Sequence, residues 1–209
     1  MQVERTLAAL GTEYVDLYCI HWPVPKKHCE AYLELQTLQA EGKIRSLGVS
    51  NYTVEDYDEL VAHEGVTVPP AINQIEVNPF LYRKRTLAAF HERGVAIQAY
   101  RALRDGKAFD DGMVKAIAAK HSRTAAQVLG RWCVQHGVIY IPKSVLRTRM
   151  EENAKVFDFA LDAGDMKALD SLTTSKAIDM FAELYAKCVN RGTPLDGSLE
   201  GVRQKFTCD

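Results

Sequence analysis

Apolar and polar positions along this chain follow two alternating periods. Short runs of β-forming residues predict strands at residues 15–20, 44–49, 71–77, 95–100 and 138–141. Between these runs, apolar residues recur at helical spacing. That spacing predicts helices at residues 2–10, 30–41, 54–63, 83–92, 111–120, 124–136, 147–156 and 163–172. A regular alternation of strand and helix predicts a parallel sheet covered by helices.

Glycines and capping residues mark several ends of these elements. Gly11 and Gly42 end the helices that precede the first two strands. Either Asn51 or Thr53 can cap the helix at 54–63, and Thr53 with Asp56 three residues later is close to a capping box. The boundaries drawn from periodicity therefore agree with the local stop and start signals.

Polar residues stand at the C-terminal end of every predicted strand. The first strand leads to His21, after which Trp22-Pro23 forces a stop. The other four strands end at Ser50-Asn51, Asn73–Glu76, Gln98–Tyr100 and Pro142–Ser144. Barrels of the α/β class carry their chemistry on such a rim. No strand is followed by a Gly-x-Gly-x-x-Gly or phosphate-loop motif, which argues against a Rossmann dinucleotide site.

The predicted fold class is therefore α/β, of the TIM (β/α)8 barrel family. A full barrel needs eight strands, typically in about 250 residues. This chain of 209 residues shows five strands, so we expect it to cover about the last five βα units of an incomplete barrel. The missing strands would lie before Met1, and an open sheet would leave two exposed edges. Residues 1–173 form the partial barrel, and residues 174–209 form a helix and tail.

Composition indicates which kinds of partner the chain is unsuited to bind and in which cell compartment we expect it. The chain is 47% hydrophobic and 25% charged, with a net charge of −1, which predicts no general affinity for nucleic acid or membranes. It has neither an 18-residue apolar run nor a signal-peptide core. Five irregularly spaced cysteines indicate neither a disulfide framework nor a zinc site, so we expect no metal and a cytoplasmic location.

Several motifs identify a family. They are the segments Asp16–Pro23, Gly42–Asn51, Asn73–Glu76 and Ile141–Ser144, and Arg149 with Glu152-Asn153. In order and spacing they resemble the aldo-keto reductase family from about residue 3 to residue 172. The short segment after Tyr100 resembles the compact members, which are diketogluconate-reductase-like or protozoal prostaglandin F synthase-like. The resemblance implies a TIM barrel that reduces aldehydes and ketones to alcohols with NADPH, and a C-terminal tail that closes over the active-site mouth.

The resemblance makes His21 the catalytic histidine, which with Trp22 would bind the carbonyl substrate. A neutral imidazole N–H can orient a carbonyl oxygen. The alternatives are a core histidine and ordinary packing of the tryptophan. In the tail, Cys188, Arg191 and Phe206 would line the mouth, or the tail would only wrap the surface.

The resemblance also implies a site for NADPH or NADP⁺. Ser50, Asn51 and Gln74 would hold the nicotinamide carboxamide, Tyr100 would stack on its ring, and Leu103 and Val145 would complete the site. Lys143, Ser144 and Arg149 would clamp the 2′-phosphate, with Glu152 and Asn153 on the adenine side. Turn chemistry and a solvated cationic face are the alternative interpretations. The clamp predicts a preference for NADPH over NADH.

Two departures from the family pattern limit this interpretation. Arg101 stands where a serine usually contacts the pyrophosphate, and it could replace or obstruct that contact. The aspartate, tyrosine and lysine motifs of the catalytic tetrad do not occur in the sequence, so we expect impaired turnover. The alternative is a non-catalytic nucleotide-binding or protein-interaction product of a truncated gene. A full family fold would be a monomer, whereas this chain could self-associate.

Overall fold

The computed structural model describes residues 2–190, 201–202 and 205–206 of the chain, and it contains one five-stranded sheet. All the strands are parallel, in the order β1-β2-β3-β4-β5. They are β1 (Val15–Ile20), β2 (Ile44–Ser50), β3 (Ile72–Glu76), β4 (Ala96–Tyr100) and β5 (Ile139–Tyr140). Parallel neighbours joined by helices are the topology that the sequence predicts. Only β5 differs clearly, because its ladder with β4 holds two residue pairs, Gln98 with Ile139 and Ala99 with Tyr140.

The helices also lie where the apolar spacing predicts them. They are α1 (Gln2–Leu10), α2 (His28–Ala40), α3 (Val54–Ala62), α4 (Lys84–Glu92), α5 (Gly112–Lys120), α6 (Ala125–Gln135), α7 (Arg147–Ala154), α8 (Ala163–Asp170) and α9 (Ser175–Asn190). Helix α2 starts two residues before the predicted start. Thr53, not Asn51, caps α3, and it forms the capping box with Asp56.

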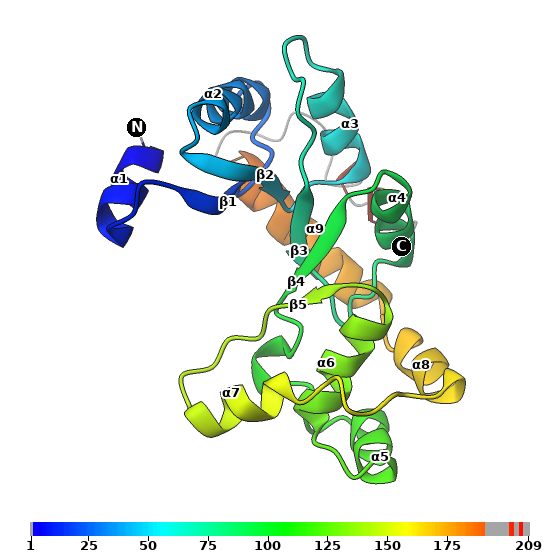
Figure 1. Ribbon diagram of the computed structural model, residues 1–209. Coiled ribbons are helices and arrows are strands. Elements are labelled where there is room, and N and C mark those ends of the chain that lie inside the picture. The colour runs from blue at the N-terminus through cyan, green and yellow to red at the C-terminus, as the bar shows by residue number, and fades with distance from the viewer. Residues whose placement is uncertain (1, 191–200, 203–204, 207–209) are drawn as a thin grey trace.

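Two buried clusters hold the sheet to its helices. The first packs Phe90, Ile97 and Trp132 between β3, β4 and the helices that follow them. The second packs Tyr32 and Leu47 where α2 covers β2. Figure 1 shows α1 and α2 at one end of the sheet and α5 to α8 at the other, with the strands crossing between them.

Helix α9 packs beside the C-terminal ends of the strands. Its buried stripe, which includes Phe181 and Tyr185, contacts Trp22 after β1 and Leu81 after β3. The Tyr185 hydroxyl donates a hydrogen bond to Asp56, so α9 is also tied to the start of α3. Leu184 of α9 lies outside this stripe and is 39% exposed. No helix in the described part of the chain is long and apolar enough to cross a membrane.

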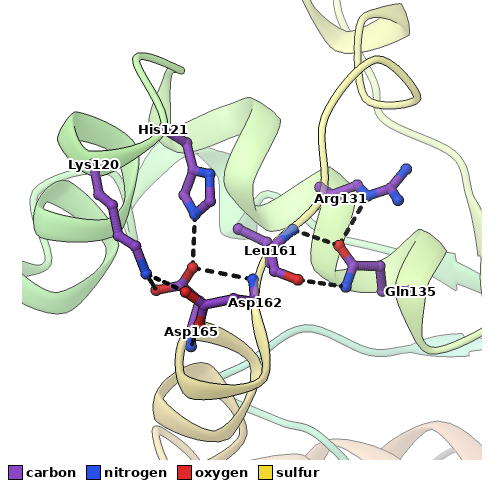
Figure 2. A network of polar contacts seen from close by, with 7 residues as sticks. All are labelled: Lys120, His121, Arg131, Gln135, Leu161, Asp162 and Asp165. Carbon is purple, nitrogen blue, oxygen red and sulfur yellow. Dashed lines mark hydrogen bonds and ion pairs between the residues drawn. The ribbon is translucent and has the colours of Figure 1, made fainter.

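A polar network joins α5, α6 and the segment that leads into α8 (Figure 2). Lys120 Nζ donates to Asp165 Oδ1 at 2.8 Å and also to Asp162, while His121 Nε2 lies 2.6 Å from Asp165 Oδ2. On α6, the Gln135 amide donates to the carbonyl of Leu161 and accepts from its N–H. This network fixes the chain that follows α7.

Candidate functional site

Five polar residues from three strand ends form one hydrogen-bonded cluster. Tyr100 Oη donates to Asn51 Oδ1 at 2.8 Å, and Asn51 Nδ2 donates to Ser50 Oγ at 3.1 Å. Ser50 Oγ donates to the carbonyl of Gln74 at 2.8 Å, and the Gln74 amide donates to Gln98. The cluster therefore joins the ends of β2, β3 and β4. Four of the five, Ser50, Asn51, Gln74 and Tyr100, are residues that the sequence assigns to the nicotinamide end of the cofactor, and Gln98 is the fifth.

These polar groups already satisfy one another. Ser50 is 5% exposed and Asn51 is 2% exposed. Asn51 also adopts a left-handed backbone conformation with φ of 62°, and its Nδ2 donates to the carbonyl of His21 at 3.1 Å. Burial raises the pKa of the Tyr100 hydroxyl, so Tyr100 stays a neutral donor. A ligand carboxamide would have to exchange partners with this cluster.

A cleft of about 1010 Å³ opens beside the cluster, between the loop after β4 and the segment from β5 into α7. Eight of the eleven predicted cofactor-binding residues line it. They are Tyr100, Leu103, Lys143, Ser144, Val145, Arg149, Glu152 and Asn153. Tyr100 belongs both to the cleft and to the strand-end cluster. The tertiary structure thus brings the predicted nicotinamide and phosphate ends into one continuous region.

The cleft has a positive balance of charge. Lys143 and Arg149 line it together with Arg101 and Lys107, against the carboxylates of Asp105 and Glu152. Within the part of the chain that the structure describes, Lys143 and Arg149 are exposed and form no ion pair. Free cations of this kind suit a polyanionic ligand. Lys107 also lines the cleft, but the sequence does not predict this, because no motif marks the loop that carries it.

The N-terminus of α7 borders this region, since Val145 and Arg149 line the cleft. Its N-cap residue, Leu146, makes no side-chain capping hydrogen bond. The Ser144 hydroxyl instead accepts from the Leu146 N–H at 3.2 Å. An uncapped helix start with Arg149 in its first turn attracts anions. Gln127 on α6 holds the other end of α7 through the carbonyl of Lys155 at 3.0 Å.

His21 and Trp22 follow β1 and are not part of the cleft wall. His21 is exposed, and its ring stands 5.8 Å from that of Trp22. Trp22 packs edge-on against Tyr185 of α9, with ring centroids 6.1 Å apart. The structure therefore groups Trp22 with the C-terminal helix, and the predicted roles of both residues in substrate binding stay predictions.

Arg101 has protein partners in this structure. Its guanidinium donates to Glu76 Oε2 at 3.0 Å and lies 3.2 Å from Asp105 Oδ2. Burial raises the pKa of the Glu76 carboxyl, although the charge of Arg101 opposes this effect. The arginine that replaces the expected serine is thus anchored at the cleft wall, with its side chain 40% exposed.

The three tail residues that the sequence places at the active-site mouth, Cys188, Arg191 and Phe206, do not form one group among the described residues. Phe206 is 2% exposed and packs against Phe181 and Tyr185 of α9. Cys188 is half-buried on α9. Arg191 lies outside the described residues. The contacts of Phe206 are those of a residue that holds the tail to α9.

Comparisons with known proteins match this fold and these motifs. The model of the aldo/keto reductase family matches residues 1–174. A glyoxal reductase of Bacillus subtilis is 38% identical over 175 residues, which are 84% of this chain and 63% of that protein. A 9,11-endoperoxide prostaglandin H2 reductase of Trypanosoma cruzi is 39% identical over 84% of this chain and 62% of that protein.

Solved structures give the same result. The crystal structure of a Gox0644 mutant in complex with NADPH is 35% identical and superposes with a TM-score of 0.79. The match covers 84% of this chain and 65% of that one. The chain thus spans about three fifths of the length of the curated relatives it matches.

Proposed function

Because this chain belongs to the aldo/keto reductase family, we propose that it binds NADPH and serves the reduction of aldehydes or ketones to alcohols. The observation that carries the proposal is the cleft beside Tyr100, where Lys143 and Arg149 flank the uncapped start of α7. Tyr100 of the strand-end cluster lines that cleft, and so do the two cations. The Gox0644 complex adds support, since a structure of similar fold binds NADPH.

Each part of the region has a defined task in this proposal. Lys143 and Arg149 bind the 2′-phosphate, Ser144 and Val145 with Leu103 line the dinucleotide, and Glu152 and Asn153 contact the adenine side. Asn51, Ser50 and Gln74 exchange their mutual hydrogen bonds for bonds to the carboxamide. Tyr100 supports the nicotinamide ring, and His21 orients the carbonyl oxygen. NADPH, when bound, supplies the hydride.

The proposal includes slow turnover by this chain. Of the four groups that the family resemblance implies for catalysis, the sequence has a counterpart only for His21. General acid catalysis is typically worth about 10²–10⁴ in rate, and no tyrosine stands in the motif of the family acid. The predicted cofactor-binding residues all lie on the five βα units that are present. We therefore expect this chain to bind NADPH even though its catalytic rate is low.

The first experiment is a fluorescence titration with NADPH and with NADH. Lys143→Ala and Arg149→Ala should each weaken NADPH binding by about tenfold or more, because each removes a charge-assisted phosphate contact. NADH binding should change little in both variants. Lys155→Ala is the matched control, since Lys155 is exposed at the other end of α7 and does not line the cleft. Equal affinities for the two dinucleotides would refute the phosphate clamp.

A second candidate function is nucleotide binding without turnover. The absence of the three other tetrad motifs from this sequence favours it. An assay with glyoxal and NADPH separates the two candidates, because a relative is named for that substrate. Saturable NADPH binding with no detectable consumption would support the second.

A further inference from the structure

Three side chains of types that bind metal ions meet between α2 and α3, apart from the cleft. His28 and Cys29 are the first two residues of α2, and Glu59 lies near the end of α3. One ligand atom from each residue lies within 4.8 Å of the others. The proposed reductase function uses none of these residues, so the cluster needs an account of its own.

The distance between the His28 and Glu59 atoms is too long for an ordinary N–H···O hydrogen bond, whereas the contact between His28 and Cys29 is a weak one to sulfur. His28 Nε2 is 3.7 Å from Glu59 Oε2 and 3.8 Å from Cys29 Sγ. A good N–H···O hydrogen bond has donor and acceptor about 2.7–3.2 Å apart. Bond lengths of about 2.0–2.3 Å at tetrahedral angles separate neighbouring zinc ligands by roughly 3.3–3.6 Å. The distances from His28 Nε2 to Glu59 and to Cys29 are therefore close to ligand spacing, and all three atoms lie within 4.8 Å of one another. Rotation of the Cys29 and Glu59 side chains would bring them to one ion.

The surroundings of His28 hold its ring in a suitable orientation. The ring is 3% exposed and packs edge-on against Tyr52, with centroids 5.5 Å apart. Its Nδ1 lies 3.3 Å from the hydroxyl of Tyr52. If the proton sits on Nδ1 and is donated to this hydroxyl, Nε2 keeps a free lone pair, with Glu59 Oε2 at 3.7 Å. Cys29 Sγ lies 3.8 Å from both ring nitrogens, so the thiol has to rotate toward Nε2 to share an ion with it. Histidines that bind metals are commonly oriented in this way through their other nitrogen.

We propose that His28, Cys29 and Glu59 bind one zinc ion, with water in the fourth position. A thiolate, an imidazole and a carboxylate form a ligand set that suits zinc better than magnesium or calcium, which prefer oxygen. The Glu59 side chain is 62% exposed, which gives the ion and its water a path from solvent. Because its ligands come from both helices, the ion would fasten α2 to α3.

Binding has to overcome one cost. Burial, together with the negative charges of Glu59 and Glu30, raises the pKa of the Cys29 thiol. A metal ion must displace that proton, as it does in other thiolate sites. The same two carboxylates offset the charge of a divalent cation. We therefore expect a site of moderate affinity that fills when zinc is added to the purified chain.

Cobalt(II) is the probe for the first experiment, because a thiolate ligand gives cobalt a charge-transfer absorption band. The wild-type chain, kept reduced, should bind one Co²⁺ with this band, and added Zn²⁺ should abolish it. Cys29→Ser should remove the band, whereas Cys188→Ser should retain it. Absence of the band in the wild-type chain, or its survival in Cys29→Ser, would overturn the proposal.

Glu59→Gln tests the site without disturbing the fold, because it changes an exposed side chain. We expect it to weaken Co²⁺ and Zn²⁺ binding by about tenfold or more, by the loss of one ligand. Glu34→Gln, at an exposed glutamate of α2 outside the cluster, should bind as the wild-type chain does. Added Zn²⁺ should raise the melting temperature of the wild-type chain more than that of Glu59→Gln. Equal affinities in the two glutamine variants would rule out Glu59 as a ligand.

Discussion

At the scale of single residues, Gly48 shows how closely neighbouring strands approach. It lies inside β2, between β1 and β3. A Cβ atom added there would meet Cys19 Sγ at 2.7 Å and Ile72 Cγ1 at 2.9 Å. Real Cβ contacts are longer than this, so the neighbouring side chains fill the space that glycine leaves. The glycine is therefore required by packing and not by its backbone conformation.

Gly48→Ala should lower the free energy of unfolding by about 1–3 kcal/mol through overpacking. Gly112→Ala is the control, because a Cβ at Gly112 meets no atom within 4 Å at the start of α5. That change should be neutral or should stabilise by up to about 1 kcal/mol. Urea denaturation followed by circular dichroism measures both values. A loss for Gly112→Ala as large as that for Gly48→Ala would contradict the packing argument.

At the scale of elements, the network of Figure 2 couples α5 to α8 through charge. The hydrogen bond from Lys120, with the backbone donor of Asp165, holds the pKa of Asp162 at about 2, below its usual 3.8. Burial opposes the same shift at Asp165, but Lys120 and His121 still hold the pKa of that carboxyl below its usual range. Both aspartates also form the capping box of α8. Charge and capping therefore act on the same pair of side chains.

These depressed pKa values predict that the stability of the fold falls as the pH is lowered. Their contribution is present above pH 3.8, where the carboxylates of the unfolded chain are ionised, and is lost as the pH falls toward about 2. Lys120→Met should therefore flatten the decline of the melting temperature between pH 5 and about 2. Lys167→Met, an exposed change on α8, should leave the decline as it is. Thermal unfolding in a series of buffers measures this, and parallel curves for wild type and Lys120→Met would argue against the coupling.

At the scale of the whole molecule, the sheet has two edges within the described residues. Strand β1 pairs only with β2, and β5 pairs only with β4. Ile139 of β5 is 44% exposed, and an apolar hollow of about 460 Å³ lies beside it, against α6 and the end of α7. Exposed strand edges with apolar side chains favour pairing with another chain. This edge is the place where we expect self-association to start.

We expect the 23.4 kDa chain to form larger species as its concentration rises. Ile139→Lys should shift the population toward the monomer, since charged residues on an edge oppose strand pairing. Met113→Lys adds the same charge to an exposed apolar residue of α5, away from the edge, and should have little effect. Sedimentation velocity over a range of concentrations gives the mass. A monomer throughout would contradict the expectation.

Much of the fold could be predicted from local signals. Helices α3 and α6 begin directly after Thr53 and Thr124, which cap them. The boundaries of both helices in the structure lie within a residue of those predicted. The length of β5 could not be predicted in the same way. An apolar run predicts a strand, but only the pairing with β4 decides that the ladder holds two residue pairs. The buried stripe of α9 likewise depends on contacts with Trp22 and Asp56, which come from distant segments of the chain.

The sequence by itself determined the order of strands and helices, the parallel sheet, and the residue types gathered at the strand ends. These follow from periodicity, capping and sequence motifs, which act over a few residues. Only the tertiary structure decided that Ser50, Asn51 and Tyr100 satisfy one another, that Arg101 bonds Glu76, and that His28 meets Glu59. Those contacts join residues up to 49 positions apart, and their geometry is fixed only when the helices and strands pack together.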